Sequence, residues 1–304
     1  MPPASGTGAP GTPAQARQIY ALGPEGTFSD QAAHRVRDLM GAALGGDGLP
    51  IRYAHTIPEV LRLVESDPDG WGVIPIENSV AGTIGQAQDG LVMHRVTIVR
   101  ELALRVRHAL LASVPLPDVR VVYAHPQAVD QCSEYLAAHL PQAEVEFTRS
   151  NMDSSVRFQQ GAGQQPPRAV AAIVPMESGQ AQPKWLAASD IQTHQNNLTR
   201  FLVVRRAREP ESYDFTRRKT TVCIAPRDDE NHEDRPGLLF ELLSIFYKHK
   251  INLARLESRP SKSRPWAYVF FLDFTNNPDS EICLAELRRA TATVTVLGSY
   301  DPLE

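Results

Sequence analysis

The sequence predicts an α/β protein in two parts, a two-lobed α/β domain followed by a smaller βαββαβ unit. Short apolar segments alternate with helix-like segments from residue 18 onward, which is typical of a largely parallel sheet. Two long strand-like stretches at 97–112 and 199–206 interrupt this alternation, and a charged segment at 207–218 is followed by a new pattern. A chain of 304 residues is long enough for both parts.

The elements of the first part follow from apolar runs and the turn residues that bound them. Ser29 is a suitable N-cap for a helix that ends near Leu39, and Pro126 fits the first turn of a helix that ends near Leu140. A third helix is expected at 57–64. Strands are expected at 19–22, 51–55, 71–76, 119–124, 145–148 and 169–174. Because the two long stretches cross the domain, we expect two hinged lobes with a ligand between them.

A different pattern begins at residue 219. Apolar residues at helical spacing predict a helix over 237–249, and a second helix is expected over 281–291. Strands are expected at 220–225, 251–257, 266–274 and 294–297. The resulting order is that of a ferredoxin-like unit, which by itself assigns no function.

Composition excludes several classes of protein. Apolar residues make up 42% and charged residues 22%, as in soluble globular proteins. The net charge of −4 argues against nucleic acid as a partner, and no apolar run is long enough to span a membrane. Residues 1–17 are rich in Pro, Gly and Ala, so we expect a disordered tail and no secretory signal. The sequence therefore predicts a cytoplasmic protein.

Cysteine and histidine spacing predicts neither a disulfide nor a metal site. The three cysteines, Cys132, Cys223 and Cys283, lie far apart, and the nine histidines form no H-E-x-x-H motif. No cofactor fingerprint and no Ser/His/Asp set is found, so we expect no cofactor.

The first polar stretch, Gly-Pro-Glu-Gly-Thr-Phe-Ser at 23–29, joins the first strand to the first helix. Backbone N–H groups at a helix N-terminus attract anions, and Thr27 and Ser29 add hydroxyl donors. A capped turn without a ligand is the alternative. The stretch is not a phosphate-binding P-loop, because the Gly-Lys-Ser/Thr ending is missing.

Two more polar stretches follow strands, where side chains of an open α/β sheet face the ligand. In the segment 75–83, Asn78 can donate and accept hydrogen bonds and Glu77 can accept them. After another strand comes His125, with Gln131 in the first turns of the next helix. A turn with an Asn or Ser cap is the alternative for the first stretch, and a packing histidine is the alternative for the second.

The fourth stretch, Asn-Asn-Leu-Thr-Arg-Phe at 196–201, leads into the second crossing strand. Thr199 could donate a proton to a leaving oxygen, and Arg200 could bind a carboxylate through two hydrogen bonds. Taken alone, the stretch is an ordinary strand start. A site of neutral hydrogen-bonding groups and cations suits a small anionic substrate that is already primed to react.

Together these four stretches, in this order and spacing, resemble the prephenate dehydratase family. The resemblance covers residues 18–300 and includes Gln131-Cys132 after the His-Pro-Gln segment. It implies a two-lobed catalytic domain of the periplasmic-binding-protein-like (type II) fold at 18–206, a linker at 207–218 and an ACT regulatory domain at 219–300. Because no long helical segment precedes Gly23 in this sequence, we expect no fused chorismate mutase.

The resemblance implies conversion of prephenate to phenylpyruvate, carbon dioxide and water. Such an enzyme must hold two carboxylates and help hydroxide to leave. We expect Thr199 to be the proton donor and Arg200 the carboxylate clamp, with Asn78 and Gln131 completing the catalytic set. The other residues expected to contact the substrate are Thr27, Phe28, Ser29, Glu77, Ser79, His125 and Phe201.

The last part is similar to the family's ACT domain, which implies L-phenylalanine as an effector bound at a subunit interface. Residues 236–239 stand at the family's Gly-Ala-Leu loop, and 257–260 match its Glu-Ser-Arg-Pro motif. We therefore expect a homodimer or homotetramer formed through this domain. The expected effector residues are Gly237, Leu238, Leu239, Asn252, Leu253, Glu257, Ser258, Arg259 and Pro260.

Three positions depart from the family pattern. Ala124 replaces the serine before His-Pro-Gln, Leu238 replaces the alanine of the Gly-Ala-Leu loop, and the family's Ser-Thr-Ala segment is replaced at 150–155, where Ser154 or Ser155 is the substitute. Two alternatives stay open. One is arogenate dehydratase, with the same chemistry on the amino-acid analogue, and the other is a non-catalytic amino-acid sensor.

Overall fold

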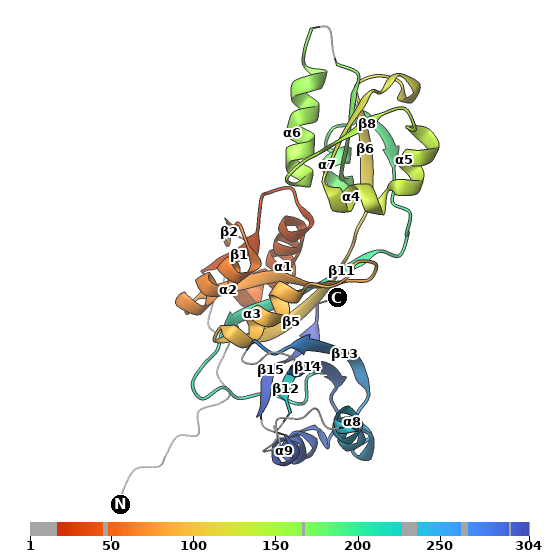
Figure 1. Cartoon of the computed structure of the whole chain (residues 1–304). Coiled ribbons are helices and arrows are strands. Elements are labelled where there is room, and N and C mark those ends of the chain that lie inside the picture. The colour runs from red at the N-terminus through yellow and green to blue at the C-terminus, as the bar shows by residue number, and fades with distance from the viewer. Residues whose placement is uncertain are drawn as a thin grey trace, which may run out of the picture.

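The computed structural model describes residues 17–44, 48–165, 168–226, 236–262, 267–291 and 293–303. Two lobes and a C-terminal unit are stacked along one long axis, with the first lobe in the middle (Figure 1). Apart from Arg17, the expected disordered tail lies outside the described residues. In the described part of the chain, no helix is long and apolar enough to cross a membrane.

The first lobe is an α/β layer in which β3 is the central strand. This strand, β3 (Gly70–Asn78), is buried along nearly its whole length because helices cover both faces of the sheet. It lies between β1, which runs parallel to it, and β11, which runs antiparallel. The other elements of the lobe are β1 (Gln18–Leu22), α1 (Phe28–Leu44), β2 (Ile51–Ala54), α2 (Ile57–Ser66), β4 (Gly82–Thr83), α3 (Gly85–Met93), β5 (Val96–Arg105) and β11 (Leu198–Arg206).

The second lobe has its own five-stranded mixed sheet, in the order β10-β6-β9-β7-β8. The stretch at 97–112, expected as one strand, is two strands in different sheets, because the chain leaves the first lobe at residues 106–107. The helix expected from Pro126 is divided at the buried Cys132. The elements are β6 (His108–Ala112), a 3₁₀ turn (Leu116–Asp118), β7 (Val121–Ala124), α4 (Pro126–Gln131), α5 (Ser133–His139), β8 (Glu144–Phe147), α6 (Asn151–Ala162), β9 (Val170–Pro175), α7 (Met176–Gln180) and β10 (Leu186–Ser189).

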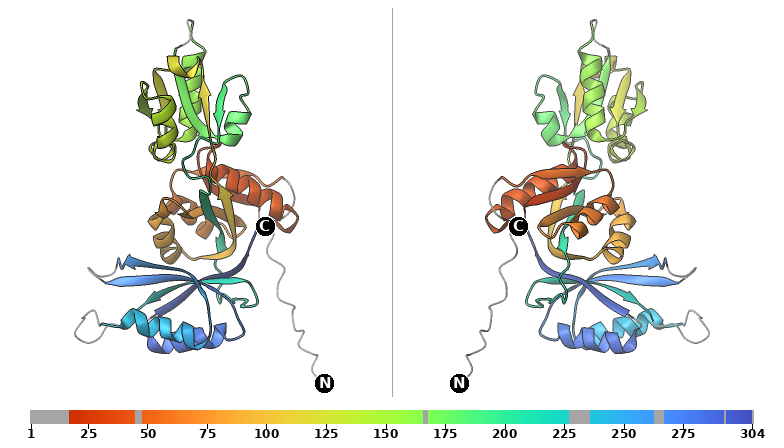
Figure 2. Two further views of the ribbon diagram at one scale, coloured as in Figure 1. Left: turned by 90° about the vertical axis from the view of Figure 1, so that its right-hand side faces the viewer. Right: turned by 90° about the vertical axis from the view of Figure 1, so that its left-hand side faces the viewer.

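The C-terminal unit has the expected βαββαβ order, with strands arranged β13-β14-β12-β15. Both helices pack on one face of its sheet, the face that points away from the first lobe (Figure 2). The two-lobed α/β architecture and the ferredoxin-like unit are thus confirmed. The elements are β12 (Lys219–Ala225), α8 (Leu238–Lys248), β13 (Leu253–Pro260), β14 (Tyr268–Thr275), α9 (Ser280–Ala290) and β15 (Thr293–Pro302).

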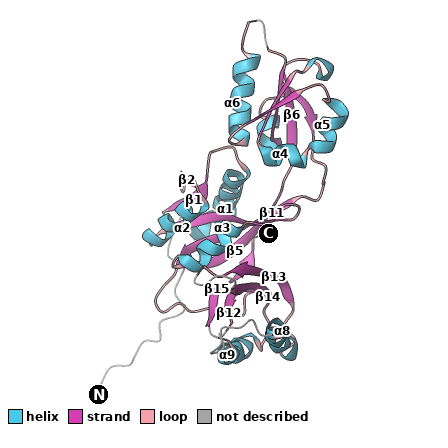
Figure 3. Cartoon of the chain, in the orientation of Figure 1, coloured by secondary structure: helices cyan, strands magenta, loops and turns pink. Residues whose placement is uncertain are grey.

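The sheets of the first lobe and the C-terminal unit are continuous (Figure 3). The second half of β15 runs parallel to β5, with Gly298 opposite Ile98. A Cβ at Gly298 would collide with the carbonyl oxygen of Ile98, so the strands approach this closely only because residue 298 is glycine. One hydrophobic core accordingly contains residues of both parts, among them Val60, Leu202, Phe271 and Tyr300.

Candidate active site at the junction of the lobes

Asn78 and Thr199 form the centre of the candidate site, because β3 and β11 place them directly opposite each other. Asn78 Nδ2 donates to Thr199 Oγ1 at 2.9 Å and to Asn197 Oδ1 at 2.7 Å. Its Oδ1 accepts from the backbone N–H groups of Val80 and Ala81 at 3.0 and 2.8 Å, which fixes the orientation of the amide. Since Thr199 Oγ1 accepts from Asn78, the Thr199 hydroxyl proton is left for another acceptor.

Ser79 extends the pairing of these strands past the end of β3. Its backbone N–H donates to the Leu198 carbonyl at 2.8 Å, and its Oγ accepts from the Leu198 N–H at 2.9 Å. Ser79 therefore fixes the backbone next to Thr199 and has a supporting role in this structure.

Asn197 also belongs to this candidate site. The sequence analysis included it in the motif at 196–201 but assigned it no role. It is buried, it accepts from Asn78 through its side chain, and its carbonyl accepts from the Val106 N–H at 2.8 Å. Val106 belongs to the other crossing segment, so Asn197 links the Asn78–Thr199 pair to both segments that connect the lobes. Its place next to Leu-Thr-Arg-Phe was the signal that could have identified it.

Arg200 does not face the substrate side, which corrects the expected carboxylate clamp. Successive strand residues point to opposite faces of a sheet, so Thr199 and Arg200 diverge. Arg200 donates through Nε to Glu101 at 2.7 Å and through Nη1 to Asp273 at 2.5 Å. Its Nη2 donates to the Tyr300 hydroxyl at 2.9 Å. The guanidinium is therefore engaged inside the protein, against the C-terminal unit.

The same alternation moves two expected substrate contacts away from the site. Glu77, next to Asn78, faces the C-terminal unit and lies 2.9 Å from Arg255 Nε. Phe201 lies on the same face as Thr199, but it is 1% exposed and packs in the core beneath α1. Neither side chain is placed to touch a ligand between the lobes.

The second lobe contributes Gln131, the last residue of α4. Gln131 Oε1 lies 2.8 Å from His108 Nε2, and its carbonyl accepts from the Thr193 N–H at 2.8 Å. Thr193 lies in the crossing segment that ends at Asn197, so Gln131 and the Asn78–Thr199 pair border the same hinge. Because the amide oxygen accepts from His108, the NH₂ group of Gln131 is turned away from that ring.

His108 is a site residue that the sequence analysis missed. It begins β6 directly after the first crossing, and it is almost fully buried. Burial lowers the pKa of its imidazole, which keeps the ring neutral. The bond to the Gln131 oxygen requires the proton on Nε2. A lone histidine in an otherwise apolar strand was the available signal.

The first residue of α1 and the loop before it each meet the second lobe at one point. The rings of Phe28 and His108 pack edge to face with centroids 5.4 Å apart, and a Cβ at Gly26 would collide with Met152 Cε. Thr27 Oγ1 donates to the Pro24 carbonyl and accepts from the Asp30 N–H, so Thr27 caps the helix. Ser29, in the first turn of α1, is buried at 8% exposure.

Other expected polar groups at the junction also have internal partners. His125 Nδ1 accepts from the Gln127 N–H at 3.3 Å and so caps α4, and burial lowers the pKa of His125. Ser154 shares a hydrogen bond of 2.7 Å with Thr148, and Ser155 accepts from Gln182 at 3.2 Å. Ser154 also donates to the Ser150 carbonyl at 3.2 Å, whereas among the described residues the Ser155 hydroxyl only accepts and keeps its proton for another acceptor.

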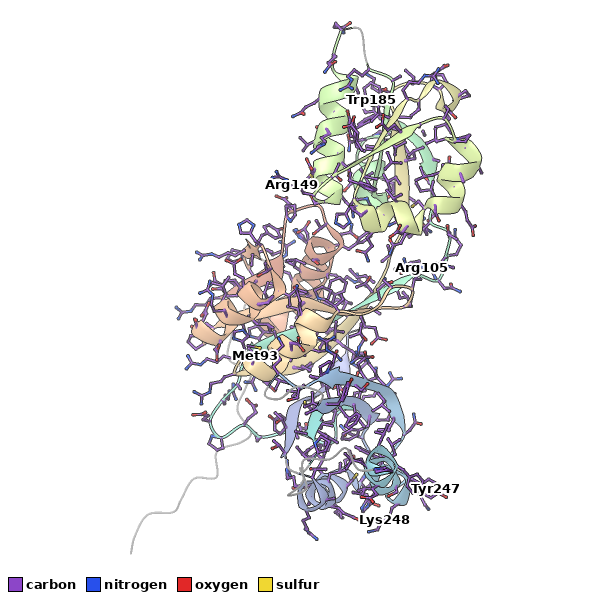
Figure 4. The ribbon with its side chains drawn as sticks, viewed as in Figure 1. Met93, Arg105, Arg149, Trp185, Tyr247 and Lys248 are labelled. Carbon is purple, nitrogen blue, oxygen red and sulfur yellow. The ribbon has the colours of Figure 1, made fainter. Side chains whose placement is uncertain are left out.

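Two cations border the junction that the sequence did not indicate. Arg105 ends β5 at the hinge, and Arg149 precedes α6 where the second lobe faces the first (Figure 4). Both side chains are exposed. Arg107, two residues after Arg105, binds Asp190 through two hydrogen bonds of 2.6 Å and so joins the two crossing segments.

A cavity of about 430 Å³ lies away from this junction. It is lined by Trp71, Arg95 and Arg205 among others. Arg205 pairs with Trp71 at one end of β11, whereas Thr199 pairs with Asn78 at the other, so the cavity is separate from the candidate site. Within the described ranges, no group of three or more His, Cys, Asp or Glu side chains is placed to hold a metal.

The expected effector residues divide into two groups. Gly237, in the left-handed conformation (φ 88°), precedes α8, and Asn252 follows its other end, so an 11-residue helix of about 16 Å separates them. One copy of the chain therefore does not bring them together. Glu257 accepts from Thr83 at 3.0 Å, and Arg259 donates to Asp89 at 3.1 Å, so these two side chains contact the first lobe.

Comparisons with known proteins agree with this architecture. Residues 19–209 match the family model for prephenate dehydratase, and 231–291 match that for the ACT domain. The prephenate dehydratase of Methanocaldococcus jannaschii is 32% identical over 288 residues, which cover 93% of this chain and 97% of that protein.

Two solved structures are similar over nearly the whole chain. One is the prephenate dehydratase of Staphylococcus aureus, with a TM-score of 0.76, 29% identity, and coverage of 93% of this chain and 99% of that one. The other is the prephenate dehydratase of Arthrobacter aurescens in complex with L-Phe, with a TM-score of 0.75, 28% identity, and coverage of 93% and 89%.

The fold and these comparisons thus define a two-lobed α/β protein of the dehydratase class that carries a C-terminal ACT domain. The family model for prephenate dehydratase matches residues 19–209, and the Methanocaldococcus jannaschii enzyme is 32% identical over 93% of this chain. This chain belongs to the prephenate dehydratase family.

Proposed function

We propose that this protein converts prephenate to phenylpyruvate, carbon dioxide and water. The observation that supports the proposal is the hydrogen bond from Asn78 to Thr199, which leaves the Thr199 proton for a ligand. The family membership supports the same reaction.

In the proposed reaction, the ring carboxylate leaves as carbon dioxide, and the electrons of the broken C–C bond flow into the ring. The C–O bond at the opposite ring carbon breaks as the ring becomes aromatic. The departing hydroxide takes the Thr199 proton and leaves as water, and the Thr199 oxygen regains a proton from solvent before the next turnover. Asn78 Nδ2–H then stabilises the negative charge that develops on Thr199 Oγ1, because it already donates to that atom.

The second lobe would orient the substrate. Gln131 turns its NH₂ group away from His108, which suits a carboxylate or hydroxyl of the substrate. Arg105 and Arg149 are the exposed cations at the junction, and they take the clamp role that Arg200 cannot fill. Closure of the lobes would exclude water and strengthen these interactions.

The test is turnover of prephenate by the purified chain, followed by phenylpyruvate absorbance, with arogenate as the comparison substrate. Thr199→Ala should lower kcat about 10²–10⁴-fold, because the proton donor is lost. Thr199→Ser is the matched control, since it retains the hydroxyl, and it should keep most of the activity. Normal turnover by Thr199→Ala would remove Thr199 from the donor role.

We also propose that L-phenylalanine binds the ACT domain and regulates the enzyme. The relative from Arthrobacter aurescens was solved in complex with L-Phe, which supports the proposal. Gly237 and Asn252 lie at opposite ends of α8, so a site that uses both would form between two copies of the chain. Gly237→Val and Asn252→Ala should weaken the response of turnover to phenylalanine. An unchanged response in both variants would contradict this site.

A further inference from the structure

The interface between the first lobe and the ACT domain contains a charge cluster to which six different strands each contribute one residue. The first lobe supplies two anions and one cation, and the ACT domain supplies two cations and one anion, so the cluster is neutral overall. Its members are Glu77, Glu101, Arg200, Lys219, Arg255 and Asp273. We call it the interface charge cluster.

Arg200 is the centre of this cluster. It bridges Glu101 of its own lobe and Asp273 of the ACT domain, at 2.7 and 2.5 Å. The Asp273 side chain is only 2% exposed and also accepts from Thr221 at 2.7 Å. Burial alone would lower the pKa of Arg200, but Asp273, Tyr300 and Glu101 outweigh it and raise the pKa, so the guanidinium is charged. Removing one partner of such a buried set leaves an uncompensated charge.

Each active-site strand carries one side chain that faces the ACT domain: Arg200 donates hydrogen bonds across the interface, and Glu77 forms an ion pair. On β11, Thr199 faces the junction of the lobes and Arg200 faces the ACT domain. On β3, Asn78 faces the junction and Glu77 faces Arg255 at 2.9 Å. The pairing of β11 with β3 shifts register immediately after Arg200, so the regular strand ladder is interrupted beside Thr199. The cluster anchors both strands at this interruption.

We propose that Arg200 and Glu77 are positioning residues, through which the docked ACT domain holds Thr199 against Asn78. The proposal rests on the proposed function, and it explains how Thr199 and Asn78 are kept opposite each other. It also gives a route for regulation, because Arg255 lies on β13, the strand that carries Glu257 and Arg259. A ligand that shifts β13 would move the partner of Glu77.

The test compares Asp273→Asn with Glu211→Gln in the full-length protein. Asp273→Asn keeps the shape of the side chain and removes the charge that faces Arg200. Glu211 pairs with Arg205 at 2.7 Å, at the opposite end of β11, so its variant breaks a comparable ion pair away from Thr199. We expect Asp273→Asn to lower kcat about 10- to 100-fold with little change in KM, as a misplacement of about 1 Å can do. Glu211→Gln should leave kcat near the wild-type value.

A double-mutant cycle separates positioning from a general loss of structure. Adding Asp273→Asn to Thr199→Ala should lower kcat no further, because the group being positioned is already missing. A drop of the same factor in both backgrounds, or wild-type kcat in Asp273→Asn, would overturn the proposal. Tyr300→Phe, which removes one acceptor of Arg200, is the second variant if Asp273→Asn does not fold.

A measurement that does not require turnover makes this test independent of the proposed reaction. Amide hydrogen exchange at residues 198–201 should be faster in Asp273→Asn than in Glu211→Gln. If the wild-type protein does not convert prephenate, the proposed function fails while this comparison still decides the positioning role. Equal exchange rates in the two variants would contradict it.

Discussion

His108 Nε2 and Gln131 Oε1 lie 2.8 Å apart, and this one contact fixes both the tautomer of a buried imidazole and the orientation of a neighbouring amide. The oxygen can only accept, so the ring nitrogen must donate. A residue of β6 thereby determines which group of α4 faces the junction between the lobes.

Replacing His108 should destabilise the protein and disturb Gln131 together. His108→Leu leaves the Gln131 oxygen without this donor, which should lower the free energy of unfolding by about 1–3 kcal/mol. His108→Gln is the control, because its side-chain amide can donate to Gln131 again. Urea denaturation measures both variants, and equal stabilities would contradict the role of the hydrogen bond.

The pKa of His108 predicts a pH dependence of stability. Burial lowers this pKa in the folded protein, whereas the unfolded chain takes up the proton near the ordinary value of about 6.5. The unfolded state therefore binds more protons below that pH, and stability falls as the pH drops through about 6.5 toward the folded pKa. The His108→Leu variant should lose this part of the slope in denaturation measured from pH 8 to 5. Identical slopes in the two proteins would exclude it.

The NH₂ group of the Asn78 side chain should contribute more to kcat than its amide oxygen does. Asn78→Asp keeps an oxygen for the Val80 and Ala81 N–H groups, but it loses the N–H donors to Thr199 and Asn197. We expect kcat for prephenate to fall about 10²–10³-fold, as for the loss of a charge-stabilising donor in other active sites. Retention of activity by Asn78→Asp would show that the donor is dispensable.

The cysteines should be unreactive in the folded protein. Burial raises the pKa of Cys132, Cys223 and Cys283 to about 12, so almost no thiolate forms at neutral pH. Mass spectrometry after treatment with iodoacetamide should show no label on the native protein and three labels after unfolding. Labelling of the native protein within minutes would contradict the burial of the thiols.

Gly298→Ala should weaken the joint between the first lobe and the ACT domain. The added methyl group would meet the backbone carbonyl of Ile98, which cannot move without breaking the β15–β5 pairing. We expect a loss of about 1–3 kcal/mol in thermal or urea unfolding. Gly48→Ala is the matched control, because a Cβ there meets no atom of the described residues within 4 Å. Equal stabilities of the two variants would contradict the close approach.

The apolar runs and turn residues were sufficient to predict the order of lobes and the ferredoxin-like unit, because burial patterns are local. The motifs also named Asn78 and Thr199, which the structure brings together. The motif also placed Arg200 in the site, but strand alternation turns its side chain to the opposite face, where it contacts Glu101 and Asp273.

Long-range contacts account for most of what the sequence did not show. The last strand was expected to end at residue 297, yet β15 continues to Pro302 because its polar second half pairs with β5, a partner about 200 residues away. In the same way, Glu257 and Arg259 were expected to meet an effector, and no local pattern indicates that they contact Thr83 and Asp89.

The shared hydrophobic core has a consequence for any attempt to separate the two parts. Val60 and Leu202 of the first lobe and Phe271 and Tyr300 of the ACT domain are each at most 2% exposed in a single packed cluster. A truncated chain that stops before β12 would present one half of that cluster to water, next to an unpaired β5 edge. Such a fragment should aggregate, so we expect that the two-lobed part cannot be obtained in soluble form by removing the ACT domain.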